Sequence, residues 1–262
     1  MNRFIRYVSQ LSSARYLVFV VALSACHPEF DPKLYPQPEQ LFAVGLKEYN
    51  LKHWENAVQA FDQLTRFLPA RDPLLPLSYF YLGKAQDQGG DHLLAAQSFA
   101  HVAESFPEDS LAPRALLNGG QAYASMWQKP QLTPEYGQFA LSTLQSLLAL
   151  YPDSPLVPAA QKEIARIDGL LAEKDYETGH HYLKRHAYDS AIIYFKDVLR
   201  LHPDTPAARK ASLQLYDAYT AIKYTDDARD LCQTMLKTYP HDQEVIVRCG
   251  SGSSAAASTL HT

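Results

Sequence analysis

The stretch of sequence that decides the fold is residues 179–203, which read GHHYLKRHAYDSAIIYFKDVLRLHP. It begins with Gly179, carries Ala191 twelve residues later and Phe195 four residues after that, and ends on Pro203. Its apolar residues recur every three to four positions, which is the period of an amphipathic helix. Because proline cannot continue a helix, Pro203 marks an expected helix end. The stretch therefore predicts two helices joined by a turn, with small residues where the helices approach most closely.

The same register recurs along the chain, which indicates a repeat protein. In five places a small residue is followed by two apolar residues, four and seven positions later, and by proline twelve positions later. These sets are Ala57, Phe61, Leu64, Pro69; Ala95, Phe99, Val102, Pro107; Ala140, Leu144, Leu147, Pro152; Ala191, Phe195, Val198, Pro203; and Ala228, Cys232, Met235, Pro240. Gly45 and Gly83 precede the first two sets as Gly179 precedes the fourth. This spacing is that of tetratricopeptide repeats, so we expect an all-α, tetratricopeptide-like solenoid of about five helix-turn-helix repeats.

The repeats are unevenly spaced, and this predicts the domain organisation. Successive prolines lie 38, 45, 51 and 37 residues apart. We expect repeats 1–3 over residues 39–157, with an extra loop at 129–134 that is either a contact site or a neutral insertion. A long helix from about Pro158 to Arg185 is expected to join them to repeats 4 and 5, within residues 158–242. Residues 243–262 are expected to form a flexible tail, because the serine-rich end has no periodic apolar face.

The N-terminus has the pattern of a bacterial lipoprotein signal. Residues 16–26 read YLVFVVALSAC, and Arg3, Arg6 and Arg15 precede this run with no acidic residue among them. Eight apolar residues would span about 12 Å as a helix, too short to cross a bilayer. We expect residues 1–25 to be cleaved and Cys26 to carry the lipid. The alternative is an ordinary cleaved signal followed by a chance cysteine.

The residues after Cys26 predict where the protein is anchored. His27 stands where an aspartate would signal inner-membrane retention, so an outer-membrane anchor facing the periplasm is favoured. Four prolines, Pro28, Pro32, Pro36 and Pro38, predict that residues 26–38 form an extended tether.

The net charge argues against one class of partner, and the cysteine content leaves open whether two cysteines form a disulfide. The chain has 24 basic and 28 acidic residues, and removal of residues 1–25 takes away three basic residues and no acidic one. The mature chain is thus about −7, which argues against a nucleic-acid partner. Cys232 and Cys249 could pair in an oxidising compartment. The favoured interpretation is that Cys232 is a buried structural thiol, because it takes the place of the phenylalanines of other repeats.

The sequence offers little sign of catalytic chemistry. Phosphate-binding loops, nucleophile elbows and Cys-x-x-Cys pairs are all missing from it. Glu177 and His181 have i, i+4 spacing, with His180 beside them, but an ordinary polar helix surface explains them better than a metal does. Asp226 and Asp227 favour a helix N-terminus more than acid–base work. We expect no enzyme activity, no cofactor and no metal.

The remaining candidate is a binding surface. In a tetratricopeptide array the first helix of each repeat lines a groove that can hold a partner's segment. The repeat register places six residues on this side of the first two repeats: Phe42, Leu46, Tyr49, Phe80, Lys84 and Asp87. Aromatic rings beside charges would suit a peptide ending in an aromatic residue. The alternative is that some of these side chains pack against neighbouring helices.

Several motifs together resemble the BamD family, the lipoproteins of the outer-membrane β-barrel assembly machine. They are the lipoprotein signal, the proline-rich segment, the run ETGHHYLKRHAYDSA at 177–191, and the Tyr-Pro turns at Tyr151 and Tyr239. The resemblance extends to about residue 242. The chain departs from it where Phe67-Leu-Pro and His202-Pro replace Tyr-Pro.

The resemblance implies an adaptor with several protein partners. It implies binding to a BamA-like barrel insertase through the C-terminal repeats, and to other assembly-machine lipoproteins. It also implies that the N-terminal repeats bind the targeting strand of unfolded outer-membrane proteins. Only Cys26 carries over residue by residue.

Two other tetratricopeptide scaffolds remain as alternatives, together with an unrecognised enzyme. A pilus-assembly lipoprotein combines the same anchor with shorter repeats. A Tol-linked cell-wall coordinator has similar turns but a coiled-coil N-terminus, which this chain lacks.

Overall fold

A computed structural model describes residues 30–257 of the chain, with side chains up to residue 250. The predicted signal 1–25 and Cys26 lie outside the described residues. Within 30–257 every regular element is helical. The elements are a 3-10 turn, η1 (Pro32–Leu34), and α2 (Pro38–Asn50), α3 (Trp54–Phe67), α4 (Leu74–Gly89), α5 (His92–Ser105), α6 (Ala112–Ser125), α7 (Glu135–Leu150), α8 (Val157–Lys184), α9 (Tyr188–Leu201), α10 (Pro206–Ala221), α11 (Thr225–Thr238) and α12 (Gln243–Ala257).

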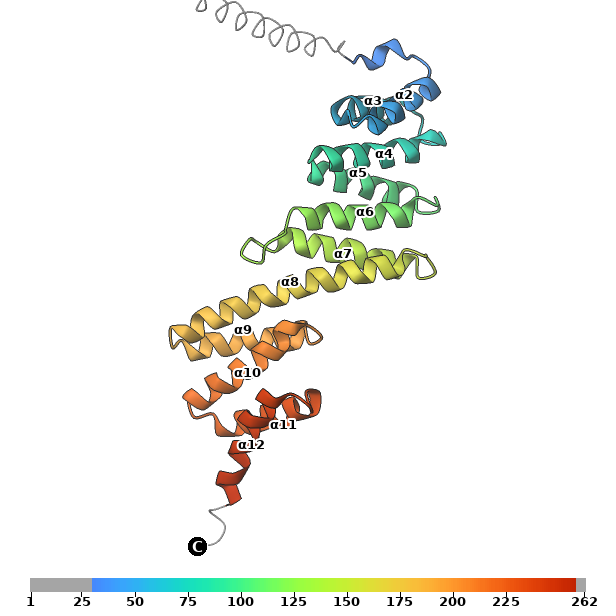
Figure 1. The fold of residues 1–262 in the computed structure, drawn as a ribbon. Helices are drawn as coiled ribbons and strands as arrows, with labels where there is room; N and C mark the ends of the chain where they lie inside the picture. The colour runs from blue at the N-terminus through green and yellow to red at the C-terminus, as the bar shows by residue number, and fades with distance from the viewer. Residues whose placement is uncertain (1–29, 258–262) are drawn as a thin grey trace, which may run out of the picture.

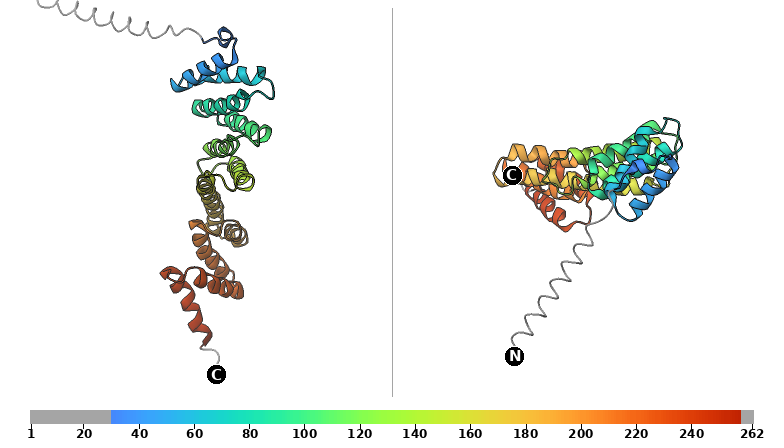
Figure 2. Two further views of the ribbon diagram at one scale, coloured as in Figure 1. Left: turned by 90° about the vertical axis from the view of Figure 1, so that its right-hand side faces the viewer. Right: turned by 90° about the horizontal axis from the view of Figure 1, so that it is seen from above.

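The helices stack one on the next in chain order, as Figure 1 shows from blue to red. Two further views show the same elongated stack (Figure 2). The helix pairs α2–α3, α4–α5 and α6–α7 form the first three units, and α10–α11 forms the fifth. The predicted tetratricopeptide-like solenoid is confirmed.

The long helix α8 belongs to two units at once. Its first half packs with α7 through Ala160 and Ile167, and its second half packs with α9 through Ala172 and Tyr176. The bounds of α8 agree with the helix expected from about Pro158 to Arg185. It is both the last wall of the third unit and the first helix of the fourth.

The glycines allow the two helices of a unit to lie close together. A Cβ atom at Gly45 would lie 3.0 Å from the ring of Phe61, one at Gly83 2.9 Å from Phe99, and one at Gly179 2.7 Å from Phe195. Real Cβ atoms almost never come this close to other atoms, so each phenylalanine fills the space that a side chain would occupy. In the third unit Gly120 and Leu144 make the equivalent contact.

The fifth unit reverses this arrangement of small and large residues. Tyr216 stands sixteen residues before Cys232, as Gly179 stands before Phe195, and both lie in the core cluster at the end of the molecule. Cys232 forms a disulfide with Cys249, with the two Cα atoms 5.4 Å apart. The interpretation of Cys232 as an unpaired buried thiol is therefore wrong. It is buried as expected, but it also bonds to a helix that the repeat register does not include.

The second helices end where the prolines predict. Helices α3, α5, α7, α9 and α11 each end two residues before the proline of their unit. In the turn that follows each second helix, one side chain accepts a hydrogen bond from a backbone N–H at the beginning of the following helix. This bond satisfies an N–H group that has no partner within that helix. The acceptors are Asp72, Asp109, Ser154, Thr205 and Asp242.

The structure differs from the flexible tail expected from residue 243. Helix α12 occupies Gln243–Ala257, and Val245 and Cys249 are buried against Met235 of α11. The end of the chain from 258 lies outside the described residues. The helix is stabilised because its apolar residues at 245 and 249 pack against α11. The serine-rich end has no apolar period that would predict this packing.

The proline-rich tether also differs from the expectation in its described part. From residue 30 it is folded back rather than extended: Phe30 stacks on Tyr35 with ring centroids 6.2 Å apart. Both rings pack against the core of the first unit. Proline prevents an α-helix here, but it permits the short 3-10 turn η1.

Some first helices of neighbouring units contact each other directly. Helix α2 contacts α4, α6 contacts α8, and α8 contacts α10, whereas α4 and α6, like the second helices of neighbouring units, have hardly any contact. In a solenoid of this kind we expect the first helices to line the concave face.

Candidate peptide-binding groove

Three aromatic rings and a lysine gather where α2 meets α4, and we call them the aromatic cluster: Phe42, Tyr49, Tyr81 and Lys84. The ring of Tyr81 lies edge-on to Phe42 and to Tyr49, with centroids 5.9 Å apart in both pairs. The same ring stacks on Phe61 of the core at 5.6 Å. Tyr81 is thus held from behind by the core and from both sides by α2, which makes the cluster rigid.

Lys84 places its charge over this cluster. Its Nζ atom lies 5.0 Å from the ring centre of Tyr49 and 5.3 Å from that of Tyr81. Attraction between the ammonium and the two ring faces fixes the lysine without neutralising it. The cluster therefore presents a positioned positive charge between tyrosine rings, which suits a carboxylate next to an aromatic group.

The structure brings together four of the six predicted groove residues. Phe42, Leu46 and Tyr49 follow one another along the partly buried face of α2, and Lys84 reaches across from α4. Asp87 lies further along α4, and its Oδ1 atom lies 2.7 Å from Nδ1 of His92, so this carboxylate already has a polar partner. These placements leave ligand binding untested.

Phe80 is not where the repeat register puts it. The side chain is only 5% exposed and packs edge-on against Phe99 at 5.6 Å, so it has almost no surface for a ligand. A first helix in the middle of the array is covered by the next unit, and Phe80 faces that unit. Its equivalent Phe42 packs on Tyr81 of the next unit but keeps partial exposure.

Sequence reasoning missed Tyr81, the ring at the centre of the cluster. Its signal was available, because Tyr81 stands three residues before Lys84 and so shares a helix face with it. The repeat register alone pointed to positions 80, 84 and 87.

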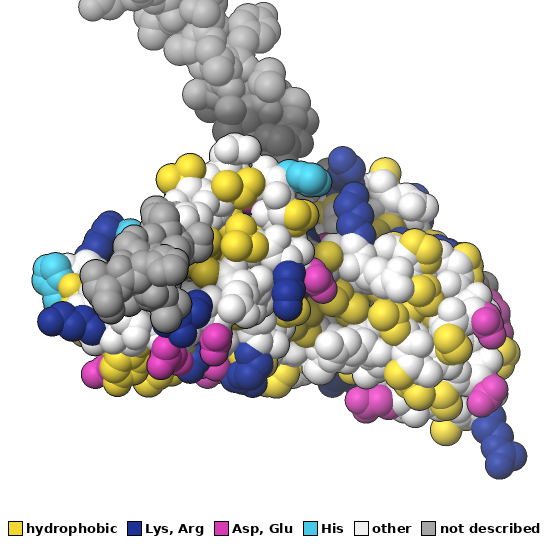
Figure 3. All heavy atoms as spheres, turned by 90° about the horizontal axis from the view of Figure 1, so that it is seen from below, with side chains coloured by type: hydrophobic (Ala, Val, Ile, Leu, Met, Phe, Trp, Pro, Cys, Tyr) yellow, Lys and Arg dark blue, Asp and Glu magenta, His cyan; other side chains and the backbone are white. Residues whose placement is uncertain are grey.

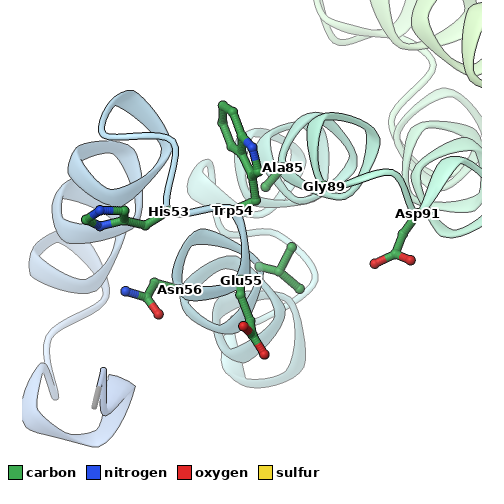
Figure 4. Close-up of a pocket in the computed structure, with 8 residues that line it drawn as sticks. His53, Trp54, Glu55, Asn56, Ala85, Gly89 and Asp91 are labelled. Atoms are coloured by element: carbon green, nitrogen blue, oxygen red, sulfur yellow. The ribbon is translucent and has the colours of Figure 1, made fainter. Parts of the chain in front are cut away.

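A pocket of mixed polar and apolar lining adjoins the cluster at the start of α3. It encloses about 600 Å³ and is lined by residues of α3, α4 and the turn to α5, including Trp54, Asn56 and Asp91. Figure 4 shows Trp54 pointing away from Glu55 and Asn56. The ring of Trp54 lies 5.3 Å from that of Tyr49, so the pocket and the cluster share a wall.

Glu48 supplies a negative charge beside this pocket. It accepts hydrogen bonds from Asn56 Nδ2 and pairs with His53 Nδ1, both at 2.8 Å. Partial burial raises the pKa of the Glu48 carboxyl, but these two hydrogen bonds and the nearby His53 outweigh it, so the net pKa is lowered. Glu48 is thus ionised at neutral pH.

The inserted loop of the third unit is tied to α8. Lys174 Nζ donates to the carbonyl of Pro130 at 3.1 Å, and Gln131 donates to Glu177 at 3.1 Å. Buried Trp127 donates through its ring nitrogen to the carbonyl of Leu132 at 3.3 Å. The loop is therefore a fixed part of the surface and not a free arm.

The described residues hold no group of three His, Cys, Asp or Glu side chains that could bind a metal ion. Glu177 instead accepts the hydrogen bond from Gln131, and Nδ1 of His180 donates to Oε1 of Gln214 at 2.7 Å.

A second groove lies between α9 and α11, over α10. It encloses about 720 Å³, with an apolar floor that includes Leu215 and Tyr219. Lys196 lines its α9 wall together with Arg200 and Asp197, which form an ion pair at 2.6 Å. Asp227 and Asp230 line its α11 wall. We call it the C-terminal groove.

Charges elsewhere on the surface are mixed in sign. Figure 3, which views the molecule from the C-terminal end, shows Lys and Arg interspersed with Asp, Glu and hydrophobic side chains on this face. A surface of this kind is typical of protein contacts more than of nucleic-acid binding.

Comparison with known proteins identifies a family and a fold. Residues 35–236 match the family model YfiO, described as outer membrane lipoprotein. The relative from Vibrio cholerae, outer membrane protein assembly factor BamD, is 36% identical over 93 residues, which is 36% of this chain and 39% of that protein. The chain thus spans well under half the length of this relative.

Longer alignments with lower identity reach two further proteins of the same name. The Pasteurella multocida protein is 25% identical over 78% of this chain and 82% of its own length. The Xylella fastidiosa protein is 22% identical over 86% of this chain and 81% of its own length.

A solved structure supports the fold alone. A TPR repeats protein from Bacteroides fragilis superposes with a TM-score of 0.51 at 16% identity, over 84% of this chain and 99% of that one. Across residues 30–257, no helix combines the length and the apolar character needed to cross a membrane.

Proposed function

Since the chain belongs to the YfiO family of outer membrane lipoproteins, we propose that it is a lipid-anchored periplasmic adaptor of outer-membrane β-barrel assembly. It binds the barrel insertase and unfolded outer-membrane proteins, and it acts by positioning them without catalysing a reaction. The relatives named as assembly factors support this role, and their alignments extend over most of the chain. Cys26 carries the anchor.

The observation that carries the substrate part of the proposal is the position of Lys84 over Tyr49 and Tyr81. The C-terminal carboxylate of a barrel precursor pairs with Lys84, and its terminal aromatic ring packs on Phe42 and the tyrosines. Such a contact combines charge with aromatic stacking, and both gain strength in a partly buried site. Catalysis has no support in the groove, which holds no nucleophile beside a base.

The insertase binds the C-terminal repeats. The C-terminal groove supports this assignment, because its apolar floor lies between Lys196 on one wall and Asp227 and Asp230 on the other. A partner helix with an apolar stripe and opposite charges on its two edges would match it in a single orientation.

The substrate part is tested by binding of a synthetic peptide with the C-terminal sequence of a barrel precursor. Lys84→Met keeps the length of the side chain but removes the charge, and we expect a loss of affinity of about tenfold. The matched control is Lys196→Met, because Lys196 Nζ lies over the ring of Tyr219 at 5.9 Å, far along the chain. Equal affinities for the two variants would show that the aromatic cluster does not bind the C-terminus of the peptide.

The partner part is tested by capture of the tagged, lipidated protein from detergent-solubilised envelopes, followed by mass spectrometry. Recovery of the barrel insertase in equal amount is the expected result, together with other lipoproteins of the assembly machine. Recovery of pilus or Tol-system proteins in its place would overturn the proposed role and leave the scaffold fold intact.

A further inference from the structure

The two large hydrophobic side chains with the greatest exposure in the described part of the chain both lie in its first unit. Phe67 is 78% exposed at the end of α3, and Leu34 is 71% exposed in η1. Single exposed hydrophobic residues are common and need no explanation. Two such residues at the same end of an elongated molecule do need one.

A largely apolar hollow lies between Phe67 and the residues that follow Leu34. Phe67 borders this hollow of about 330 Å³, whose wall includes Tyr35 and Pro36, the residues that directly follow Leu34. Leu68 and Pro69 continue the same wall. We call Leu34, Phe67 and this wall the N-terminal patch.

The acidic side chains around the N-terminal patch are turned to the protein. Asp31 accepts the backbone N–H of Lys33 at 2.9 Å, and Asp72 accepts that of Leu74 at 2.9 Å. Asp62 forms an ion pair with Arg66 at 2.9 Å. Arg66 thus balances the charge of Asp62, and the hydrogen bonds hold Asp31 and Asp72 to the backbone of their own turns, which limits repulsion toward a phospholipid surface.

The length of the connecting chain decides what covers the N-terminal patch. Phe30 packs against the core of the first unit, and Cys26 precedes it by four residues. Four residues span at most about 14 Å even when fully extended. A lipid on Cys26 therefore keeps the first unit within reach of the membrane surface.

We propose that Phe67 and Leu34 insert into the interface of the membrane that carries the Cys26 lipid. This inference rests on the proposed acylation of Cys26. Acyl chains give the affinity, and the N-terminal patch sets which end of the solenoid touches the bilayer. The aromatic cluster and the C-terminal groove are then held at defined distances from the membrane.

The test measures contact of position 67 with lipid in the acylated full chain. Phe67→Trp adds a tryptophan at an exposed site, and tryptophan is well suited to a membrane interface. The matched control is Leu150→Trp, because Leu150 is 64% exposed and also ends a second helix two residues before its proline. Each variant is reconstituted into vesicles with and without bromine-labelled acyl chains, and the fluorescence of the added tryptophan is compared.

We expect bromine to quench the added tryptophan of Phe67→Trp several-fold more than that of Leu150→Trp. Flotation of both variants with the vesicles distinguishes failure of the lipid anchor from failure of the membrane contact at Phe67. Protein that fails to float would disprove the anchor, and with it this inference. Protein that floats but shows equal quenching at both positions would leave the anchor standing and overturn the membrane contact. Loss of a dimer in Phe67→Ser by sedimentation would identify a second copy as the occupant instead.

Discussion

At the scale of the residue, the fold depends on a contact between a glycine and a phenylalanine sixteen residues apart, which recurs in three units. A Cβ atom at Gly179 would lie 2.7 Å from the ring of Phe195, so the close approach of α8 and α9 depends on a missing side chain. Gly169, ten residues earlier on the same helix, has nothing within 4 Å of its Cβ position. The two glycines thus differ in packing while sharing the backbone conformation of one helix.

This difference predicts opposite effects of the same substitution. Gly169→Ala should stabilise the protein by about 0.5–1 kcal/mol, because alanine has the better helix propensity. Gly179→Ala should destabilise it by roughly 1–3 kcal/mol, since overpacking against Phe195 exceeds that gain. Chemical denaturation of both variants measures the two free energies of unfolding. A similar gain for both would contradict the packing role of Gly179.

Asp242 joins two elements through one carboxyl. It accepts a bond from the guanidinium of Arg209 on α10 and caps the start of α12 through the N–H groups of Glu244 and Val245. The bond from Arg209, aided by these backbone donors and opposed by a smaller desolvation effect, lowers the pKa of Asp242 from 3.8 to about 2.

This pKa shift predicts an acid-sensitive helix. A carboxyl whose pKa is lower in the folded state stabilises the fold above its unfolded value of 3.8, and this contribution is lost as pH falls toward about 2. The difference in thermal midpoint between the wild-type protein and Asp242→Asn should therefore shrink over that range. A constant difference from pH 7 to pH 2 would argue against the contribution of Asp242.

At the scale of the element, α12 depends on the disulfide as well as on its cap. The bond between Cys232 and Cys249 joins α12 to α11 across a sequence separation of 17 residues. Closing a loop of this size is worth roughly 3 kcal/mol in the chain-entropy model. Because solenoid units contact only their neighbours, the benefit should remain local.

Reduction of the disulfide should accordingly loosen the C-terminal end and spare the rest. We expect faster hydrogen exchange over 243–249 in the double variant Cys232→Ser, Cys249→Ser, and unchanged exchange over 39–157. The wild-type protein in reducing buffer serves as the control and should match the double variant. Unchanged protection of α12 would show that the packing of Val245 and Met235 is sufficient.

At the scale of the whole molecule, α8 determines how the N-terminal units sit relative to the C-terminal ones. With 28 residues it is the longest described helix, and it packs against α7 and α9 along its length. His202, at the end of α9, bonds to Asp168 near the midpoint of α8 at 2.6 Å. A continuous helix transmits orientation because every turn is hydrogen-bonded to the next.

A break in α8 should therefore change the shape of the molecule more than its local packing. Gly169→Pro removes one helical hydrogen bond and introduces a clash with the preceding turn, at a cost of about 3 kcal/mol. Small-angle scattering should show a changed or broader distribution of interatomic distances. Gly169→Ala provides the control, and an identical scattering profile for the two variants would refute this role of α8.

Much of the fold was predictable because its signals are local. The second helices end two residues before Pro69 and its equivalents, and the limits of α8 follow from its apolar period. The site was predictable only in part. The register predicted that Lys84 and Tyr49 lie on one surface, which the structure shows, whereas it did not predict the burial of Phe80 or the position of Tyr81; ligand binding by these residues stays a prediction. The turn at Pro240-His-Asp242 resembles the turns that precede the other first helices, so a helix after residue 242 could also have been predicted from the sequence.

The sequence by itself determined the solenoid and the order of its units. Helix period, small–large spacing and proline position act within a few turns of one chain segment, so they are legible in the sequence. Tertiary structure alone decided the burial of Phe80 and the bond between Cys232 and Cys249. It also decided that Tyr81 and Lys84 of α4 pack against Tyr49 of α2. These features depend on how far each helix is rotated and shifted against its neighbour, which the packing of all units determines together.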